Sequence, residues 1–225
     1  VSGSGTFALT STTAPNPPCS TSGVSTVCAS STGNMASGPA GMSTYAWTIS
    51  GGTITGGASS QTVTYTAGTG TSLTLTLTIT NSNGCQSTCP KVVTINALPT
   101  CSISVPSTVC ANSTGNMADG PAGMTTYVWS LIGGTITAGG SARTVTYTAG
   151  TDASLSLFLT ITDSNGCQRI CSKIVVVKQP PTANAGSYSP ICQGGTILLS
   201  NATESNAAGR RWTASPGGGS FSPGN

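Results

Sequence analysis

Residues 72–80 read Ser-Leu-Thr-Leu-Thr-Leu-Thr-Ile-Thr, and residues 154–162 read Ser-Leu-Ser-Leu-Phe-Leu-Thr-Ile-Thr. In both stretches an apolar residue occupies every second position. Successive side chains of a β-strand point to opposite faces, so this alternation predicts a strand with one buried and one solvated face. The two stretches therefore predict a protein built from β-sheets.

The two stretches belong to a long internal repeat. Residues 19–100 and 101–182 align without insertion or deletion at a constant offset, the period of the repeat, and about two thirds of the positions are identical. Similarity at a fixed period indicates an array of one structural unit. We therefore expect complete modules at 19–100 and 101–182 and an incomplete, divergent third module at 183–225. Cys192 supports the third module because it lies one period after Cys110, just as Cys110 lies one period after Cys28.

Residues 1–18 fit the repeat only loosely. Counting back by one period aligns residues 6–13 with the last strand of a module, and a Pro-rich linker follows. This alignment predicts the end of a preceding module and its linker. Gly3-Ser-Gly-Thr-Phe7, however, resembles Gly217-Gly-Gly-Ser-Phe221, which favours a fragment of a unit like the third module. The sequence leaves both interpretations open.

Turn residues divide each complete module into short pieces. Clusters such as Gly51-Gly52 and Asn83-Gly84 leave segments that are too short for helices. Roughly seven strands in about 80 residues, with a Trp on a middle strand, predict an antiparallel β-sandwich of the immunoglobulin type. Trp47 and Trp129 could serve as a sugar-binding platform, but the strict alternation around them favours core positions.

The composition argues against several classes of partner. Only 5% of residues are charged, the net charge is +3, and no basic run exceeds two residues. This argues against a nucleic-acid or anionic-membrane surface, and no apolar run is long enough to span a membrane. Nine cysteines without any histidine favour disulfides over a metal site, and disulfides imply an oxidising, extracellular compartment. Val1 is not an initiator, so we expect an internal or mature fragment.

Residues that could perform chemistry are scarce. Glycosidases need two acids, calcium sites need several hard oxygens, and hydrolytic triads need an imidazole. The sequence therefore predicts no catalytic residue, no cofactor and no metal. Asp163 precedes the Asn165-Gly166 turn, where a turn cap is the favoured role. The carboxylates, all outside the first module, are Asp119, Asp152, Asp163 and Glu204.

Phe158 departs from the module pattern. It replaces Thr76 on the face that the alternation assigns to solvent. An outward aromatic side chain indicates either a contact with a neighbouring chain or ligand, or a side chain covered by a loop, and we favour the second interpretation. Phe158 is therefore the single candidate surface contact.

The four cysteines of each complete module allow three pairings. The residues alone do not choose among these pairings. The third unit retains Cys192 but has Ala183 where the complete modules have Cys19 and Cys101. We call the first cysteine of a module, Cys19 or Cys101, its outer cysteine and the second, Cys28 or Cys110, its inner cysteine. The outer cysteine is thus the one that a module can lose.

Several motifs resemble a known type of repeat. They are similar to the PKD-like and immunoglobulin-like repeats of very large secreted or surface-attached proteins of Bacteroidetes-type bacteria. The resemblance covers residues 19–225 and implies tandem β-sandwiches. The chain departs from the eukaryotic PKD pattern, since Thr-Ile-Ser-Gly-Gly follows Trp47 and the Trp-Asp-Phe-Gly-Asp-Gly stretch is missing. The motifs are Val-Cys-Ala-Asn-Ser (109–113), Tyr-Val-Trp-Ser (127–130), Val-Thr-Tyr-Thr-Ala-Gly (145–150), Leu-Thr-Ile-Thr-Asp-Ser-Asn-Gly-Cys (159–167) and Pro-Thr-Ala-Asn-Ala-Gly (181–186).

The resemblance also implies a cysteine pairing and a location. Related repeats with a single bridge keep the cysteine after Asn-Gly, which suggests bridges Cys28–Cys85 and Cys110–Cys167. Those bridges leave Cys19–Cys89 and Cys101–Cys171, with a partner for Cys192 beyond the last residue. Such repeats are secreted or displayed at the cell surface through a dedicated outer-membrane route, type IX secretion, whose signal lies at a C-terminus.

Two functions follow as hypotheses. The first is a structural repeat segment, the stalk or filament body of an extracellular adhesin or surface filament, with neighbouring modules of the same chain as partners. Weakly charged strand edges also favour self-association into fibres. The alternative is a carbohydrate- or surface-binding accessory module of an exported enzyme or adhesin. An exposed aromatic cluster in every module would favour that alternative, and the sequence offers only Phe158.

Overall fold

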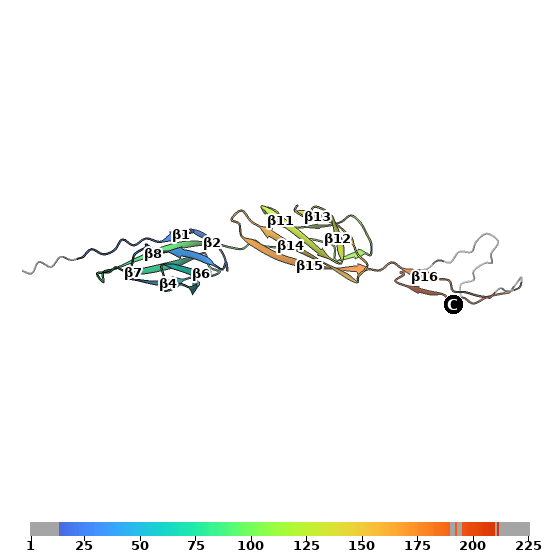
Figure 1. Cartoon of the computed structure of the whole chain (residues 1–225). Coiled ribbons are helices and arrows are strands. Elements are labelled where there is room, and N and C mark those ends of the chain that lie inside the picture. The colour runs from blue at the N-terminus through green and yellow to red at the C-terminus, as the bar shows by residue number, and fades with distance from the viewer. Residues whose placement is uncertain (1–13, 190–191, 193–194, 210, 212–225) are drawn as a thin grey trace, which may run out of the picture. The chain divides into compact units, whose positions relative to one another are not determined.

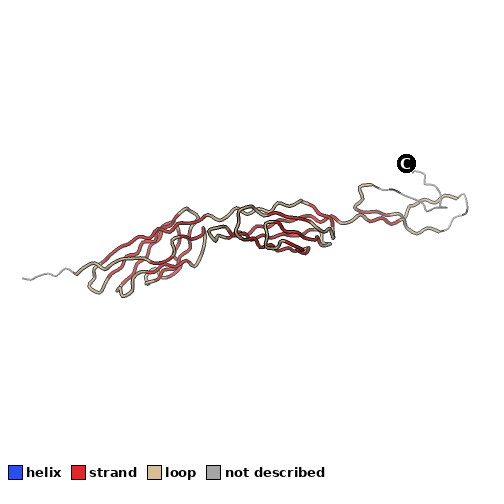
Figure 2. The backbone as a smooth tube through the Cα atoms, turned by 90° about the horizontal axis from the view of Figure 1, so that it is seen from above, coloured by secondary structure: helices blue, strands red, loops and turns tan. Residues whose placement is uncertain are grey.

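The structure, a computed structural model, describes residues 14–189, 192, 195–209 and 211. These residues form strands and loops without a helix (Figures 1 and 2). The all-β class expected from the alternation is thereby confirmed. The chain divides into two compact units. One contains the first repeat together with Gly123–Thr126 and Thr160–Ile170 of the second, and the other contains the remainder.

The first repeat folds into two sheets. One sheet has the strand order β1-β3-β6-β5 and the other β2-β8-β7-β4. Its longest strands are the alternating stretch 72–80 and the closing strand of the repeat, which pair antiparallel over nine residues of each strand. The strands are β1 Ser22–Gly23, β2 Thr26–Cys28, β3 Asn34–Ser37, β4 Thr44–Ser50, β5 Gly52–Gly56, β6 Thr62–Ala67, β7 Ser72–Thr80 and β8 Gln86–Asn96.

The core of the first repeat follows the predicted alternation. All four apolar residues of β7 are at most 1% exposed, and the Thr residues between them are only partly buried. Trp47 on β4 lies opposite Leu77 and joins the same buried cluster. Its indole Nε1 donates a hydrogen bond to the Ser60 carbonyl at 2.9 Å. The buried indole is therefore satisfied, as a core Trp requires.

The second repeat reproduces this arrangement. Each of its seven strands begins and ends one period after its counterpart. Trp129 is 5% exposed, and its Nε1 donates to the Ala142 carbonyl at 2.9 Å. The sheets have the orders β10-β13-β12 and β11-β14-β15-β9. The strands are β9 Thr108–Cys110, β10 Asn116–Asp119, β11 Thr126–Ile132, β12 Gly134–Ala138, β13 Thr144–Ala149, β14 Ser154–Thr162 and β15 Gln168–Lys178.

One strand of the first repeat has no full counterpart in the second. Gly23 on β1 has a φ of 119°, and a Cβ there would approach the Met35 carbonyl to 2.7 Å. The equivalent residue is Val105, whose side chain makes positive φ costly. In the second repeat this pairing is reduced to a single bridge between Ser104 and Asp119.

Two short strands differ from the predicted antiparallel arrangement. β2 pairs parallel with β8, and β9 pairs parallel with β15. Each parallel strand has only three residues, while the longer pairings are antiparallel. Strand direction determines which end of the sheet each terminal residue reaches.

The predicted third module is described only in part. β16 Thr182–Asn184 and β17 Thr203–Ser205 pair antiparallel. Residues 212–225 at the end of the predicted third module lie outside the described residues, as do residues 1–13 of the predicted N-terminal segment. The boundaries 19–100, 101–182 and 183–225 stay predictions.

Candidate functional sites at the repeat junction and on an outer sheet face

The outer cysteines close a bridge within the first repeat. Cys19 is bonded to Cys89 of β8, with Cα atoms 5.8 Å apart, which is the pair that the resemblance implied. Cys101 and Cys171, one period later in the sequence, are also disulfide-bonded. In the first repeat this bridge joins the chain entering the sandwich to its closing strand.

The structure corrects the expected pairing of the inner cysteines, Cys28 and Cys110, with the cysteines after Asn-Gly, Cys85 and Cys167. Cys28 is bonded to Cys167, with Cα atoms 5.5 Å apart. Cys85 and Cys110 are free thiols. The predicted bridges Cys28–Cys85 and Cys110–Cys167 are therefore wrong, and a disulfide joins the first repeat to a turn of the second.

Strand direction explains the correction. Cys28 ends the parallel strand β2 and lies opposite Asn96, the last residue of β8. Cys85 precedes Gln86, the first residue of β8. Eleven residues at about 3.3 Å each place these two ends roughly 36 Å apart. Disulfides need Cα atoms within about 7 Å of each other, so Cys28 and Cys85 of one sandwich cannot bond.

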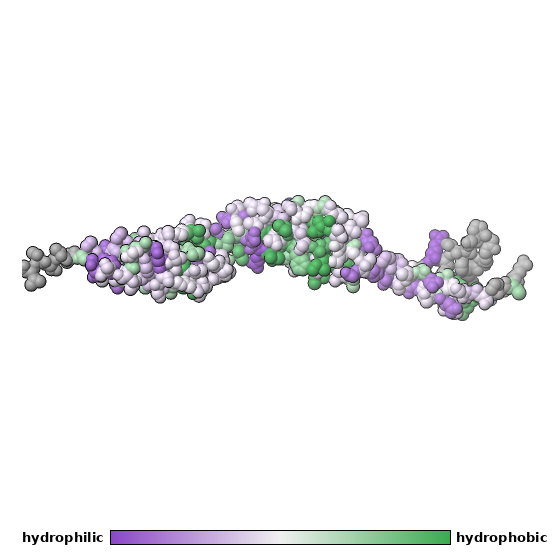
Figure 3. All heavy atoms as spheres, viewed as in Figure 1, coloured by the Kyte–Doolittle hydropathy of each residue, from purple (hydrophilic) through white to green (hydrophobic). Residues whose placement is uncertain are grey.

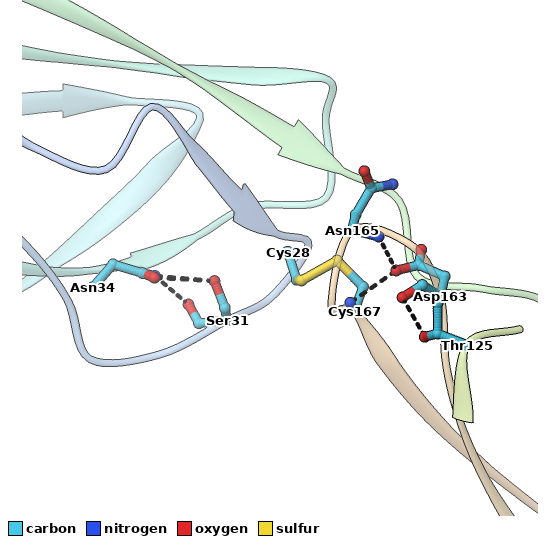
Figure 4. Close-up of a disulfide and its surroundings, with 7 residues drawn as sticks. All are labelled: Cys28, Ser31, Asn34, Thr125, Asp163, Asn165 and Cys167. Carbon is cyan, nitrogen blue, oxygen red and sulfur yellow. Dashed lines mark hydrogen bonds between the residues drawn. A yellow bond between two sulfur atoms is a disulfide. The ribbon is translucent and has the colours of Figure 1, made fainter. Parts of the chain in front are cut away.

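A hydrogen-bonded turn presents Cys167 to this bridge (Figure 4). The Asp163 carboxylate accepts hydrogen bonds from the backbone N–H groups of Asn165 and Cys167, both at 2.9 Å. The Thr125 hydroxyl donates to the Asp163 carbonyl at 2.9 Å. Asp163 is therefore a turn cap, as predicted from its position before Asn-Gly.

A loop of the first repeat holds the other sulfur (Figure 4). Asn34 Nδ2 donates to the backbone carbonyl and to the hydroxyl of Ser31, at 2.9 and 3.0 Å. The Ser31 N–H donates to the Cys28 carbonyl at 3.1 Å. Hydrogen-bonded backbone thus holds both halves of the bridge, and Cys167 is completely buried.

The second repeat carries an apolar outer face. Trp129, Leu157 and Val175 are buried, so the alternate residues of β11, β14 and β15 lie on the opposite side of their sheet. Five large apolar residues among them, Ile170 included, are between 51% and 67% exposed, and Phe158 is half-buried. We define the outer face by five residues, Val128, Ile132, Phe158, Ile174 and Val176.

The first repeat has little apolar side chain at the same positions. Only Val92, the counterpart of Ile174, is a large exposed apolar residue there. The visible surface of the second repeat accordingly carries more apolar atoms than that of the first (Figure 3). The five counterparts are Ala46, Ser50, Thr76, Val92 and Thr94.

Phe158 has the outward position that the sequence predicted. The register of the first repeat, carried forward by one period, sets Phe158 between Ser130 and Ser172. The same register sets Ile132 and Ile174 in the adjacent row. Side chains diagonal across neighbouring strands lie within reach of an aromatic ring. Sequence reasoning identified Phe158 but missed the aliphatic residues, since Val and Ile are ordinary in any strand.

The remaining aromatic and acidic residues form no recognisable reaction site within the described part of the chain. The side chains of Trp47 and Trp129 are core residues, which excludes them as a sugar-binding platform. Tyr65 and Tyr147 are fully buried, and their hydroxyl groups have no hydrogen-bond partner. Burial raises the pKa of both hydroxyls. Among the residues that the structure describes, no group of three His, Cys, Asp or Glu residues could hold a metal ion.

Solved structures with similar folds are distant from this chain. Fibronectin(III)-like modules of Clostridium thermocellum CbhA share 15% identity over 68% of this chain and 89% of theirs, with a TM-score of 0.33. A C-terminal intimin fragment, solved with the intimin-binding domain of its receptor Tir, shares 11% over 76% and 67%, with a TM-score of 0.35. Bacteroides ovatus SGBP-B, solved with a mixed-linkage heptasaccharide, shares 16% over 68% and 42%, with a TM-score of 0.27.

No curated protein matches the chain at the sequence level. None of the described residues forms a helix long and apolar enough to cross a membrane. The model of one family, described as the PKD-like domain, matches residues 14–95 and again residues 96–177. The two matches start one period apart, like the repeat itself, and together they cover most of the sequence. The chain belongs to the family of PKD-like domains.

Proposed function

We propose that this chain is a structural segment of an extracellular bacterial protein, a stalk or filament body that spaces other domains and performs no catalysis. The observation that carries this proposal is the covalent joining of two closely similar sandwiches through Cys28 and Cys167. A bridge between repeats passes force from one to the next without extending the chain between the two sulfur atoms. That property suits a spacer exposed to shear and proteases.

The distribution of differences between the repeats supports the same role. Core, turn and cysteine positions recur, whereas charged positions are exchanged, as in Gln61/Arg143, Ser87/Arg169 and Asn96/Lys178. A shared catalytic or ligand site would need polar groups in both copies. The only charged residue that both repeats share is Lys91/Lys173. The repeats thus share the residues that folding requires and few of the polar residues that a catalytic or ligand site would require.

An extracellular location fits the cysteine chemistry. Disulfides persist in secreted and surface proteins and are rare in a reducing cytosol. We therefore place the chain in a secreted or cell-surface protein. The resemblance to adhesin and filament repeats favours a surface adhesin or filament as the full-length protein. The partners of this segment are then the modules on either side of it.

Scattering from arrays of different length tests the spacer role. Proteins with one, two and three copies of residues 14–95 in tandem are compared by small-angle X-ray scattering. A spacer predicts a maximum dimension that grows by a constant increment with each copy. A dimension that stops growing because the copies fold back on each other would contradict the proposal, as would hydrolysis of glycans or peptides by the intact chain.

A second candidate function rests on the outer face. Its exposed side chains are mostly aliphatic, which suits contact with another apolar protein surface better than stacking on a sugar ring. The alternative is therefore a recognition module, or a surface for self-association into fibres. Glycan-array binding and sedimentation velocity compare the intact chain with a variant carrying V128A, F158T and V176T. These changes restore the residues of the first repeat. Binding or association lost in the variant would establish the recognition role, and equal behaviour would remove it.

A further inference from the structure

We propose that Cys85 and Cys110 are the open halves of disulfide bridges to the repeats that precede and follow this segment in the same polypeptide. The bridge between Cys28 and Cys167 joins the inner cysteine of one repeat to the cysteine after Asn-Gly in the next. Cys110 lies one period after Cys28, and Cys85 lies one period before Cys167. Consecutive repeats would thus be linked by a ladder of identical bridges. This inference holds whatever role the array serves.

Cys110 has the same backbone surroundings as its bonded counterpart. Cys28 lies opposite Asn96, and Cys110 lies opposite Lys178, each at the end of a parallel strand. The N–H groups of the residues after these cysteines donate to the Asn96 and Lys178 carbonyls at 2.8 and 2.9 Å. Cys110 is an exposed free thiol. It therefore stands at the end of the second repeat where Cys28 stands in the first.

Cys85 sits in the same turn as Cys167. The Asn81 side-chain oxygen accepts hydrogen bonds from the N–H groups of Asn83 and Cys85, at 3.0 and 2.9 Å. Asp163 makes the two corresponding bonds in the second repeat, both at 2.9 Å. The turn that presents Cys167 for bonding is thus already formed around Cys85 before any partner is present.

The contact of Cys85 with the start of the described chain is an independent observation. The Cys85 thiol donates to the carbonyl of Ala14 at 3.4 Å, and Asn81 Nδ2 donates to the Pro15 carbonyl at 3.3 Å. Ala14 lies one period before Asn96, the residue opposite Cys28. A preceding repeat in the same register would therefore bring its inner cysteine beside Ala14, where the Cys85 sulfur already lies.

The third unit fits the same scheme. It retains Cys192, one period after Cys110, but has Ala183 in place of the outer cysteine. The bridge of Cys19 and Cys89 serves a single repeat, whereas an inner cysteine serves its neighbour. The third unit therefore lacks the cysteine for a bridge within the repeat but keeps the cysteine for a bridge to its neighbour.

Each new bridge forms by oxidation of two thiols. The two sulfur atoms join, two protons are released, and two electrons pass to an external disulfide, as in a thiol–disulfide oxidoreductase, which leaves as a dithiol. An oxidising compartment supplies this chemistry and keeps the product.

Thiol counting on an array lengthened by one repeat tests the proposal. A copy of residues 14–95 is joined in front of Ala14, so that the junction reproduces the step from Ile95 to Asn96. Denatured, oxidised protein is then alkylated and mapped by mass spectrometry. The present chain has three free thiols, Cys85, Cys110 and Cys192. The ladder predicts three in the longer array as well, because the inner cysteine of the added copy bonds to Cys85. The cysteine after Asn-Gly in the added copy then becomes the free one.

A matched variant of the longer array serves as the control. Changing Cys28→Ser in the added copy alone should leave Cys85 reactive and raise the count from three to four. Five free thiols in the unaltered array, with Cys85 still alkylated, would overturn the proposal. The unaltered 225-residue chain gives a second measurement that needs no added repeat. A peptide linking Cys28 to Cys167 supports the ladder, and one linking Cys28 to Cys85 overturns it.

Discussion

The two repeats can be compared position by position, because every strand of the second has a counterpart one period earlier. Their interiors agree closely. Trp47 and Trp129 are 4% and 5% exposed, and each indole makes one 2.9 Å hydrogen bond to a carbonyl. Their outer sides differ, since Thr76 in the first repeat becomes Phe158 in the second. Folding fixes the core and the turns, while the outer face is free to acquire contacts.

The largest expected effect comes from breaking the bridge between the repeats. Cys28→Ser removes a bridge with a sequence separation of 139 residues. The chain-entropy model gives a loss of at most about 5 kcal/mol in the free energy of unfolding, because the outer bridges shorten the loop that this bridge closes. Denaturant unfolding of the oxidised proteins measures this loss. Cys85→Ser is the matched control, because Cys85 is a free thiol and its loss should leave stability nearly unchanged. Equal losses in both variants would contradict the assigned pairing.

Truncation of the core Trp residues tests the agreement of the interiors. Trp47→Ala and Trp129→Ala should each cost about 3–5 kcal/mol, because each removes a large buried side chain and leaves a cavity. The two costs should match, since burial and hydrogen bonding are the same in both repeats. Unfolding of each variant, followed by far-UV circular dichroism, compares them. A small cost at either position would show that its indole is not part of the core.

The buried Tyr hydroxyls give a smaller effect that depends on pH. Tyr147→Phe removes a hydroxyl without a partner, so at neutral pH we expect no loss and a gain of up to about 1 kcal/mol. Burial raises the pKa of Tyr65 and Tyr147 above the ordinary value of 10.0. Above pH 10 the unfolded chain therefore releases protons that the folded chain retains, and stability falls as the pH rises. Thermal unfolding from pH 7 to 11 should show a shallower fall in the Phe variant. An identical fall in the unaltered chain and in the Phe variant would contradict the raised pKa of Tyr147.

The outer face should affect folding least. Phe158→Thr introduces the residue of the first repeat, and Thr76→Phe makes the reverse change. We expect each to alter stability by no more than about 0.5–1 kcal/mol, because the position is only half-buried in the second repeat. Chemical denaturation compares the pair. A large loss for Phe158→Thr would show that Phe158 is a packing residue and would weaken the comparison of outer faces.

Much of the fold follows from the sequence, and the reasons are local. Alternation in residues 72–80 predicts the central strand, and the fixed offset carries every strand of one repeat to the other. The core position of Trp47 and the turn cap at Asp163 follow from neighbouring residues. These features depend on side-chain periodicity and turn chemistry, which a single sequence displays directly.

The junction and the outer face could not be predicted in the same way. The direction of β2 has no signature in its three residues, so the sequence did not show that Cys28 and Cys85 lie at opposite ends of β8. The residues of the outer face are spread over three strands. Only strand pairing brings Ile132 and Ile174 into one row, on either side of Ser156. Sequence alone therefore isolated Phe158, the one residue unusual for its position.

Single-molecule stretching of an oxidised variant without the outer bridges, in which Cys19, Cys89, Cys101 and Cys171 are changed to Ser and handles are attached at the two ends, tests most directly whether the repeats form a covalently continuous spacer. Force should cross from Cys28 to Cys167 through the disulfide, so the residues between them should stay out of the force path. Reduction should then release up to about 460–500 Å of chain, at 3.3–3.6 Å for each of the 139 residues. Adding Cys85→Ser to this variant should leave its extension unchanged, because Cys85 is a free thiol. We predict no extension of the chain between Cys28 and Cys167 before reduction. Full-length extension of both repeats in the oxidised chain would contradict it.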